Sequence, residues 1–287
     1  MKPFTKVFAL IALAAVGSAP AAASGHRWAL VVGVEHYKNS DIEPLRYAEA
    51  DATSVASALE KSLGFNARRV RVMTSAVSDT TQPDCPTNVH VIDALNAMAN
   101  SVGPDDTFVF YLSGHGFSRG DESFLGTIET DATSIDTLRL STIPLSMLQN
   151  VMKRVKARQV VFMIDACRND PERDKGGGEN VRTAGFSKSL EVAARPAAAL
   201  GGGSAVLFAC ADGQRGYEDP SLAHGAFTYY LVSALKGAAA LAGEPLSAAQ
   251  VAGYVLEKVT AWARQHSRQP SYWPTAWPAR SCPRAAQ

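Results

Sequence analysis

The sequence predicts an α/β fold, a three-layer sandwich in which helices cover both faces of a mostly parallel sheet. Three observations lead to this prediction. Continuous apolar runs recur along the chain, as they do in strands that are covered on both faces. Segments of helical periodicity separate the runs, and helices of that length allow parallel crossovers. With 287 residues, of which 46% are hydrophobic and 19% charged, the chain can bury one large core.

The first half of the chain begins the alternation of strands and helices. Residues 28–34 read WALVVGV and residues 107–112 read TFVFYL, so both segments are expected to be buried strands. A shorter strand is expected at 70–73. The spacing of apolar residues predicts helices at 47–63 and 89–99. Each of these helices lies between two expected strands in the sequence, so each can form the crossover connection that joins parallel strands.

The second half continues the same alternation. A helix is expected at 144–155, with Pro144 near its first residue, where a backbone N–H would have no partner within the helix. A buried strand is expected at 159–164. Residues 168–203 are charged and rich in glycine and alanine, which is typical of a long loop. Later elements are expected at 205–210 (strand), 226–235 and 248–263 (helices) and 269–278 (extended or turn-like).

Residues 1–23 are expected to be a secretory signal peptide. Lysines at the start precede an apolar run from Val7 to Val16, and small residues follow around Ala22. A bilayer-spanning helix needs about 20 apolar residues, which makes this run too short for a membrane anchor. We therefore predict export to the periplasm or beyond it, and no stable membrane insertion. The mature domain is expected at 24–287, with a large portion at 24–167, the loop at 168–203 and a small portion at 204–287.

Composition argues against a nucleic-acid partner and against a disulfide scaffold. The chain has 28 Lys and Arg against 27 Asp and Glu, a net charge of +1, and no basic stripe with interleaved aromatic residues. Its four cysteines show no metal-ligand spacing. Cys210 lies in an apolar strand and is expected in the core. Cys85 and Cys282 lie in proline-flanked loops expected near the surface, where a disulfide and two free thiols are both open alternatives.

Catalytic residue types lie just after two of the buried strands. The sequence SGHG around His115 follows 107–112, and the sequence DACR around Cys167 follows 159–164. Parallel strands bring their carboxyl ends to one edge of a sheet, so the two side chains are expected to meet there. Histidine can take a proton from a cysteine nucleophile near neutral pH. The flanking glycines leave space for a substrate, and the Gly116 N–H can point at an oxyanion.

These two motifs together resemble those of caspase-like cysteine peptidases. In that family a strand ending in His-Gly is followed about 50 residues later by a strand ending in Asp-Ala-Cys, and here the interval from His115 to Cys167 is 167 − 115 = 52 residues. The chain is most similar to the bacterial metacaspase-like (orthocaspase) group, through WALVVGVEHY from Trp28, GF at Gly64 and AHGAFT from Ala223. The resemblance covers nearly all of the mature chain, and it implies a caspase-like sandwich.

The resemblance also implies a catalytic mechanism and a cofactor requirement. Cys167 would be the nucleophile and His115 the base and later acid, with the N–H groups of Gly116 and Cys167 forming the oxyanion hole. Calcium-dependent metacaspases carry paired aspartates shortly before the helix that precedes the cysteine strand. Ser141 and Thr142 lie in that neighbourhood here. Calcium needs six to eight oxygen ligands, so we expect no metal and no other cofactor.

By the same resemblance, Asp51, Ser113 and Asp165 would line the pocket for the substrate residue that precedes the cut. Two carboxylates in one pocket favour a cation, which implies cleavage after Arg or Lys. The alternative for the two aspartates is a structural one, as helix caps or members of an ion pair. The remaining candidate histidines show no ligand spacing and are expected to be surface or packing residues: His36, His90, His224 and His266.

We therefore predict a secreted or periplasmic cysteine endopeptidase that acts on peptides or proteins through an acyl-enzyme. Two alternatives remain: a non-catalytic caspase-like domain that binds peptides, and a transamidase with the same pair of residues. Basic residues in 168–203 match the implied specificity, so self-cleavage of this loop is a hypothesis. The family resemblance favours a monomer.

Overall fold

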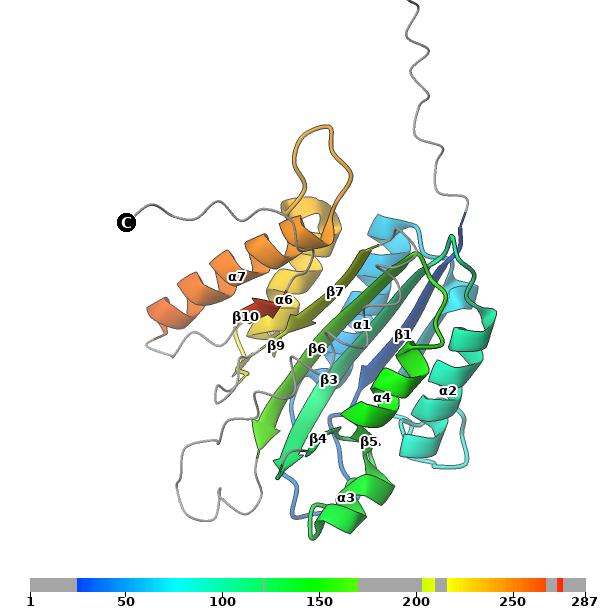
Figure 1. The fold of residues 1–287 in the computed structure, drawn as a ribbon. Coiled ribbons are helices and arrows are strands. Elements are labelled where there is room, and N and C mark those ends of the chain that lie inside the picture. The colour runs from blue at the N-terminus through cyan, green and yellow to red at the C-terminus, as the bar shows by residue number, and fades with distance from the viewer. Residues whose placement is uncertain (1–24, 121, 170–202, 210–215, 267–272, 276–287) are drawn as a thin grey trace, which may run out of the picture.

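The structure is a computed structural model that describes residues 25–120, 122–169, 203–209, 216–266 and 273–275, and it confirms the α/β sandwich (Figure 1). The main path of the central sheet has the strand order β10-β7-β6-β3-β1-β2. From β7 to β2 all neighbouring strands are parallel, and β10 is antiparallel to β7. The strands are β1 (Arg27–Gly33), β2 (Val70–Thr74), β3 (Thr107–Arg119), β6 (Gln159–Asn169), β7 (Gly203–Phe208) and β10 (Trp273–Thr275).

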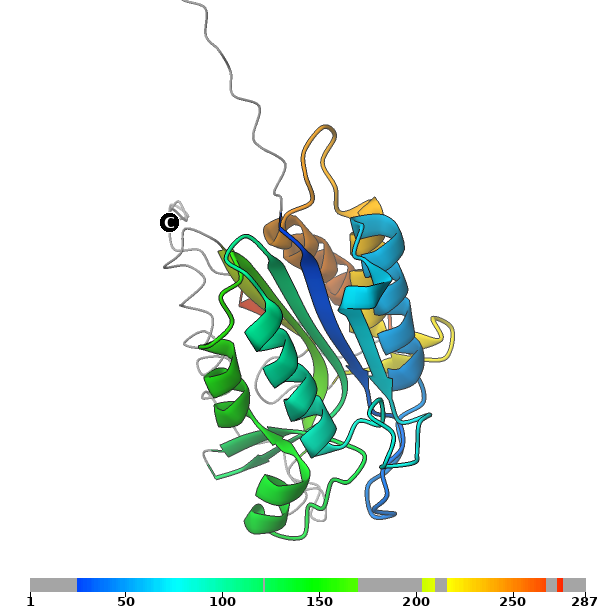
Figure 2. The ribbon, with the colours of Figure 1, turned by 90° about the vertical axis from the view of Figure 1, so that its right-hand side faces the viewer.

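Helices cover both faces of the sheet, as Figure 2 shows from the side. One face packs against α2 (Asn88–Ser101) and α4 (Leu145–Met152). The other packs against α1 (Ala48–Leu63), α6 (Ala226–Ser233) and α7 (Ala248–Gln265). Shorter elements extend this frame: η1 (Ala67–Arg69), β4 (Glu122–Leu125), α3 (Ile135–Ser141), β5 (Ile143–Pro144), β8 (Glu218–Asp219), β9 (His224–Gly225) and η3 (Ala234–Ala238). No helix in the described ranges is long and apolar enough to cross a bilayer.

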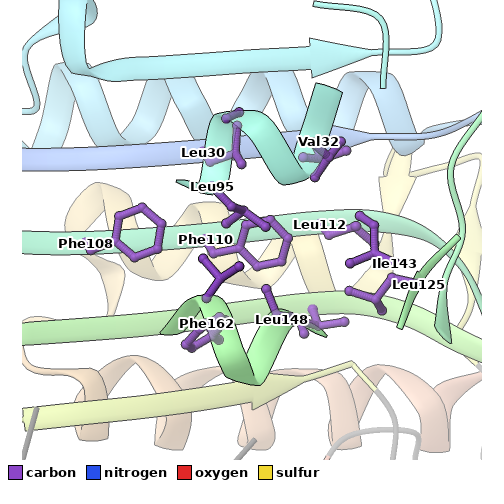
Figure 3. Close-up of a cluster of buried hydrophobic side chains, with 14 of the residues drawn as sticks. Leu30, Val32, Leu95, Phe108, Phe110, Leu112, Leu125, Ile143, Leu148 and Phe162 are labelled. Carbon is purple, nitrogen blue, oxygen red and sulfur yellow. The ribbon is translucent and has the colours of Figure 1, made fainter. Parts of the chain in front are cut away.

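Both faces of each central strand are buried, which explains the continuous apolar runs in the sequence. Successive side chains of a strand point to opposite faces. Phe108 and Phe110 therefore pack with Phe162 beneath α2 and α4 (Figure 3), while Val109 and Tyr111 pack on the side of α1 and α6. Since the same pattern repeats in β1 and β6, one sheet separates two apolar layers.

The structure differs from the predicted boundaries most at the two strands that carry the motifs. β3 and β6 continue to Arg119 and Asn169, beyond the ends expected at 112 and 164, so both motifs lie inside strands. Pairing explains the extension: the two strands stay in register from Thr107 opposite Gln159 to Phe117 opposite Asn169. Pairing between strands therefore keeps the glycine-containing segment of β3 extended, where its composition alone favours a turn.

Other boundaries shift by a few residues. α4 ends at Met152 instead of residue 155, and Pro144 is its N-cap. α6 ends at Ser233 and passes into a π-helical segment in which Gly237 has a φ of 108°. β7 ends at Phe208, two residues before the expected end. Cys210 lies outside the described residues, as do the segment 1–23, most of the loop 168–203, and Cys282.

Cys85 was expected near the surface, and that prediction is wrong. Its side chain is fully buried and forms no disulfide within the described part of the chain. Burial raises the pKa of the thiol, and a buried apolar thiol packs like a small hydrophobic side chain. A disulfide between Cys85 and Cys282 stays untested, because Cys282 lies outside the described ranges.

The close approach of β1 to α1 depends on Gly33. A Cβ at this position would lie 2.5 Å from the Ala48 carbonyl oxygen and 2.8 Å from the Ala52 Cβ, and backbone cannot move away cheaply. We expect Gly33→Ala to lower the free energy of unfolding by about 2 kcal/mol or more, as overpacking of a core does. Gly253→Ala in α7 is the matched control. Nothing lies within 4 Å of its Cβ, so better helix propensity should raise stability by up to about 1 kcal/mol.

Urea unfolding of both variants measures the difference. Equal effects of the two substitutions would contradict the packing of β1 on α1 described above.

Candidate active site

A cavity of about 410 Å³ opens at the carboxyl ends of the parallel strands. It brings together four residues predicted from the sequence, Asp51, Ser113, His115 and Asp165, together with Gly225, which the motif analysis did not assign to the site. The four come from α1, β3 and β6. This position is where ligands of open α/β sheets bind.

His115 and Cys167 are register partners in adjacent strands. The pairing of β3 with β6 sets His115 opposite Cys167 and Ser113 opposite Asp165. Neighbouring strands lie about 4.8 Å apart. Residues separated by 52 positions in the chain are therefore adjacent in the sheet, as the two motifs predicted.

The imidazole of His115 is held in one orientation. Its Nε2 lies 2.8 Å from the Glu43 carbonyl oxygen, while Nδ1 is buried and has no hydrogen-bond partner in the described part of the chain. A neutral imidazole has one N–H and one lone pair, and the carbonyl can only accept. Nε2 therefore donates, and Nδ1 carries the lone pair. Pro44 follows Glu43 and restricts its backbone, which steadies the accepting carbonyl.

The surroundings of His115 keep it neutral. The residue is 8% exposed, and burial lowers the pKa of the imidazole, although the Glu43 carbonyl and the charges of Glu218 and Glu43 oppose this. Tyr37 fixes the residue from the side: its ring centroid lies 5.2 Å from that of the imidazole, and its hydroxyl accepts the His115 backbone N–H at 2.8 Å. A neutral imidazole with a free lone pair is a competent base at pH 7.

The backbone at Gly116 faces the strand that carries Cys167. His115 directs its N–H to Tyr37 and its carbonyl to the Gly126 N–H, both on the side away from β6. The N–H groups of successive strand residues point to alternate sides. The Gly116 N–H therefore points towards β6, where the paired register engages it with the β6 backbone, and its role in an oxyanion hole stays a prediction.

Asp51 forms one wall of an acidic pocket. It is 2% exposed, and Oδ1 lies 2.7 Å from His224 Nδ1. The Gly225 N–H donates to both carboxylate oxygens at 3.2 Å, and the Ser113 hydroxyl donates to Oδ2 at 3.4 Å. Burial raises the pKa of the Asp51 carboxyl, while His224 and Gly225 lower it. Asp51 lies in the first turn of α1, but its side-chain bonds go to β9 and β3, so the helix-cap alternative is wrong for it. The ion-pair alternative stays open, with His224 as the partner.

Asp165 forms the opposite wall. Its Oδ2 accepts a hydrogen bond from the Thr228 hydroxyl at 2.7 Å, and the Tyr111 hydroxyl lies 2.6 Å from that of Thr228. Burial and the nearby charge of Asp51 raise the pKa of Asp165 to about 7. A Cβ on Gly225 would lie 2.8 Å from Asp165 Oδ2 and 3.0 Å from Asp51 Oδ2. Both carboxylates thus converge on the same glycine, which must lack a side chain.

Sequence reasoning missed one residue that lines the cavity, Glu218, and one that supports its wall through Asp51, His224. His224 was expected to be a surface or packing residue, but the imidazole is bonded to Asp51 and only 20% exposed. Glu218 lines the cavity, and its carboxylate accepts the N–H groups of Arg46 and Tyr47 at 2.8 and 3.0 Å. The AHGAFT segment contains His224, Gly225 and Thr228, so it was the signal for His224. Glu218 has no motif of its own.

The described residues hold no group of three or more His, Cys, Asp or Glu side chains arranged to bind a metal ion. Thr142 is buried at the end of α3, where its hydroxyl bonds the Leu138 carbonyl. Ser141 bonds the Thr137 carbonyl and the Asp131 N–H. Both hydroxyls therefore stabilise the local turn. The expectation that the protein needs no cofactor stays a prediction.

The family follows from a comparison with known protein families. The family model for the caspase domain matches residues 26–275 of this chain. The chain belongs to the caspase-domain family. It is a cysteine-peptidase domain by family, and the match spans the described sheet from β1 to β10.

Two known proteins are similar to this caspase domain. A protein of a Desulfuromonadales bacterium, described as a "probable protease", is 31% identical over an alignment of 157 residues that covers 50% of this chain and 18% of that protein. The crystal structure of a Geobacter sulfurreducens protein matches 88% of this chain and 92% of its own, with a TM-score of 0.57 and 16% identity. The first match covers less than a fifth of the relative, and the second shows likeness of fold.

Proposed function

We propose that this caspase domain is an endopeptidase that cleaves after Arg or Lys, with Cys167 as nucleophile and His115 as base. One observation carries the proposal: a buried imidazole, whose Nδ1 has no hydrogen-bond partner among the described residues, shares a cavity with two convergent carboxylates. The nucleophile is assigned from its register position opposite His115. The carboxylates supply the charge that a guanidinium or ammonium group recognises.

The reaction follows from these positions. His115 Nδ1 takes the thiol proton, and the thiolate attacks the carbonyl carbon after the basic residue. The oxyanion that forms is stabilised by the N–H groups of Gly116 and Cys167. Collapse of the intermediate breaks the C–N bond, and the imidazolium gives its proton to the leaving amine. Water then attacks the thioester of the acyl-enzyme, with His115 again acting as base, and releases the acid and the free thiol.

Fluorogenic peptides that end in Arg, Lys or Asp test this function. We expect turnover of the Arg and Lys peptides by the wild type, with or without Ca²⁺, and none by Cys167→Ala. Binding of the peptides without turnover would favour the alternative of a non-catalytic peptide-binding domain. Product joined to an added amine in preference to water would favour a transamidase. Preference for the Asp peptide would contradict the role of Asp51 and Asp165.

We propose further that the protein is exported and acts as a monomer on peptide or protein substrates. Export rests on the signal-peptide pattern of residues 1–23. Animal caspases dimerise through an edge strand of the small portion. Here β10 pairs with β7 along that side, and its Pro274 has no N–H to offer a further strand. Light scattering of the purified protein measures the mass, and a stable dimer would contradict the proposal.

Self-cleavage in the loop 168–203 is a second part of the same proposal. Arg173, Lys175, Arg182, Lys188 and Arg195 lie in this loop and match the proposed specificity. We expect fragments of the wild type on a denaturing gel and an intact Cys167→Ala chain. If both chains stay at full length, the loop is not a substrate.

A further inference from the structure

The end of the sheet opposite the catalytic cavity holds a second cavity, of about 350 Å³, with basic walls. It lies at the start of β1 and of β2, which is the edge strand of the sheet (Figure 2). Three of its lining residues are arginines, and one is an aspartate. The lining therefore carries two net positive charges, although the whole chain carries a formal charge of only +1.

The three guanidinium groups of this cavity are held differently. Arg71 is tied in place, because its Nε lies 3.1 Å from Asp84 Oδ1 and its Nη2 donates to the Pro83 carbonyl. Arg69 lies over the ring of Trp28, at 5.3 Å from the ring centroid, and its Nε is buried without a hydrogen-bond partner among the described residues. Arg68 is exposed at the rim.

A buried N–H donor without an acceptor costs free energy, and so does the mutual repulsion of three cations. An anion in the cavity relieves the repulsion, whereas the Nε of Arg69 is enclosed by protein atoms and does not open onto the cavity. The indole N–H of Trp28 is not available to the anion, because that group donates to Asp106 at 2.9 Å. The Asp106 carboxylate also accepts the N–H groups of His26 and Gly103, so its charge is already stabilised by three donors.

We infer that this cavity binds a phosphate group. Phosphate carries about 1.5 to 2 negative charges near pH 7, which is close to the two net positive charges of the lining. Its tetrahedral oxygens can accept hydrogen bonds from several directions at once, whereas a carboxylate is matched by a single planar fork. Arg69 is the central donor, and Arg68 and Arg71 flank it along the chain. The source is inorganic phosphate or a phosphorylated protein chain.

Titration of the full chain carrying Cys167→Ala tests the site without any use of peptidase activity. Sodium phosphate is compared with sodium chloride at equal ionic strength, with Trp fluorescence and the melting temperature as readouts. We expect phosphate alone to raise the melting temperature, by about 3 to 6 °C at ten times Kd. Arg69→Gln should weaken phosphate binding at least tenfold. Arg264→Gln, which removes an exposed arginine of α7, should leave binding unchanged.

Arg69→Lys separates a built site from general charge attraction. Lysine keeps the charge but loses the planar guanidinium that stacks on Trp28, so it too should bind phosphate at least severalfold more weakly. Equal responses of Arg69→Lys, Arg264→Gln and the parent would overturn the inference, and so would equal responses to phosphate and chloride. In that case the arginines only protect an edge strand from pairing. A phosphoserine peptide that binds more tightly than inorganic phosphate would identify a phosphorylated chain as the source, and weaker binding would identify the free ion.

Discussion

Replacing His115 by glutamine is expected to lower kcat/KM for Arg-ended peptides by about 10⁴-fold, the effect of losing one member of a catalytic unit. The glutamine amide can still donate to the Glu43 carbonyl, which His115 Nε2 contacts at 2.8 Å. It has no basic nitrogen to replace Nδ1. The loss should therefore fall on kcat, with KM changed by less than about threefold, because the proton transfer is an interaction of the transition state.

The same substitution at another histidine supplies the control. The side chain of His36 is 61% exposed and contacts Glu35 outside the catalytic cavity. His36→Gln should keep wild-type kinetics. Melting temperatures of both variants show whether the fold is intact. If folded His115→Gln retained a tenth of wild-type kcat, His115 would not be the base.

The pH profile of kcat gives a second measure of the same residue. Burial lowers the pKa of His115 below its ordinary value of 6.5. The acid limb of kcat should therefore lie below pH 6.5, since only the neutral imidazole accepts the thiol proton. A limb above that pH would mean that His115 is more solvated or more strongly paired than the structure shows.

The fold could be predicted from the sequence because strands that are buried on both faces of the sheet have uninterrupted apolar sequences. Strands such as 28–34 and 107–112 are apolar at every position, and the cores on both sides of the sheet require this. The short strands β4, β8 and β9 were not predicted. Each has two to four residues and contains polar ones, so it has no periodic signal. Strand pairing determines their conformation.

The adjacency of His115 and Cys167 was predictable for a similar reason, and the groups that hold His115 and Asp51 in place were not. Histidine and cysteine are residue types used in nucleophilic catalysis, and His115 and Cys167 lie near the ends of strands that their apolar runs reveal. The atom that orients the imidazole is a backbone carbonyl, at Glu43, and a carbonyl is present at every residue, so sequence cannot mark it. His224 meets Asp51 across 173 residues, and only the assembled sheet brings them together.

The pocket carboxylates are expected to govern both specificity and pH dependence. Asp165→Asn removes one of two converging charges and should lower kcat/KM for Arg-ended peptides by about 10³-fold, mainly through KM, because it removes a half-buried carboxylate that the proposed function pairs with the substrate cation. In the wild type, KM should fall as the pH rises through about 7, where Asp165 loses its proton. The variant should lack this dependence. Its KM for these peptides should stay high from pH 6 to pH 8.

The same raised pKa has a consequence for stability. Folded Asp165 keeps its proton up to about pH 7, whereas an unfolded aspartate loses it near the ordinary value of 3.8. The folded chain therefore binds more protons over this range. The stability that this provides is complete below the unfolded pKa and disappears as the pH rises through the folded pKa. At pH 8 the buried charge opposes folding, so Asp165→Asn should be more stable than the wild type by at least about 1 kcal/mol, with little difference at pH 4.

Asp131→Asn gives the opposite sign. Hydrogen bonds from the Thr133 side chain and backbone N–H lower the pKa of Asp131. Its charged form therefore favours folding at pH values above the ordinary pKa of 3.8. That variant should lose a little stability at pH 8 and keep wild-type kinetics, because Asp131 lies outside the catalytic cavity. Urea unfolding at pH 4 and pH 8 measures both variants. A destabilised Asp165→Asn at pH 8 would show that Asp165 is paired with a cation in the folded protein, and that the pocket is not poised to receive one from a substrate.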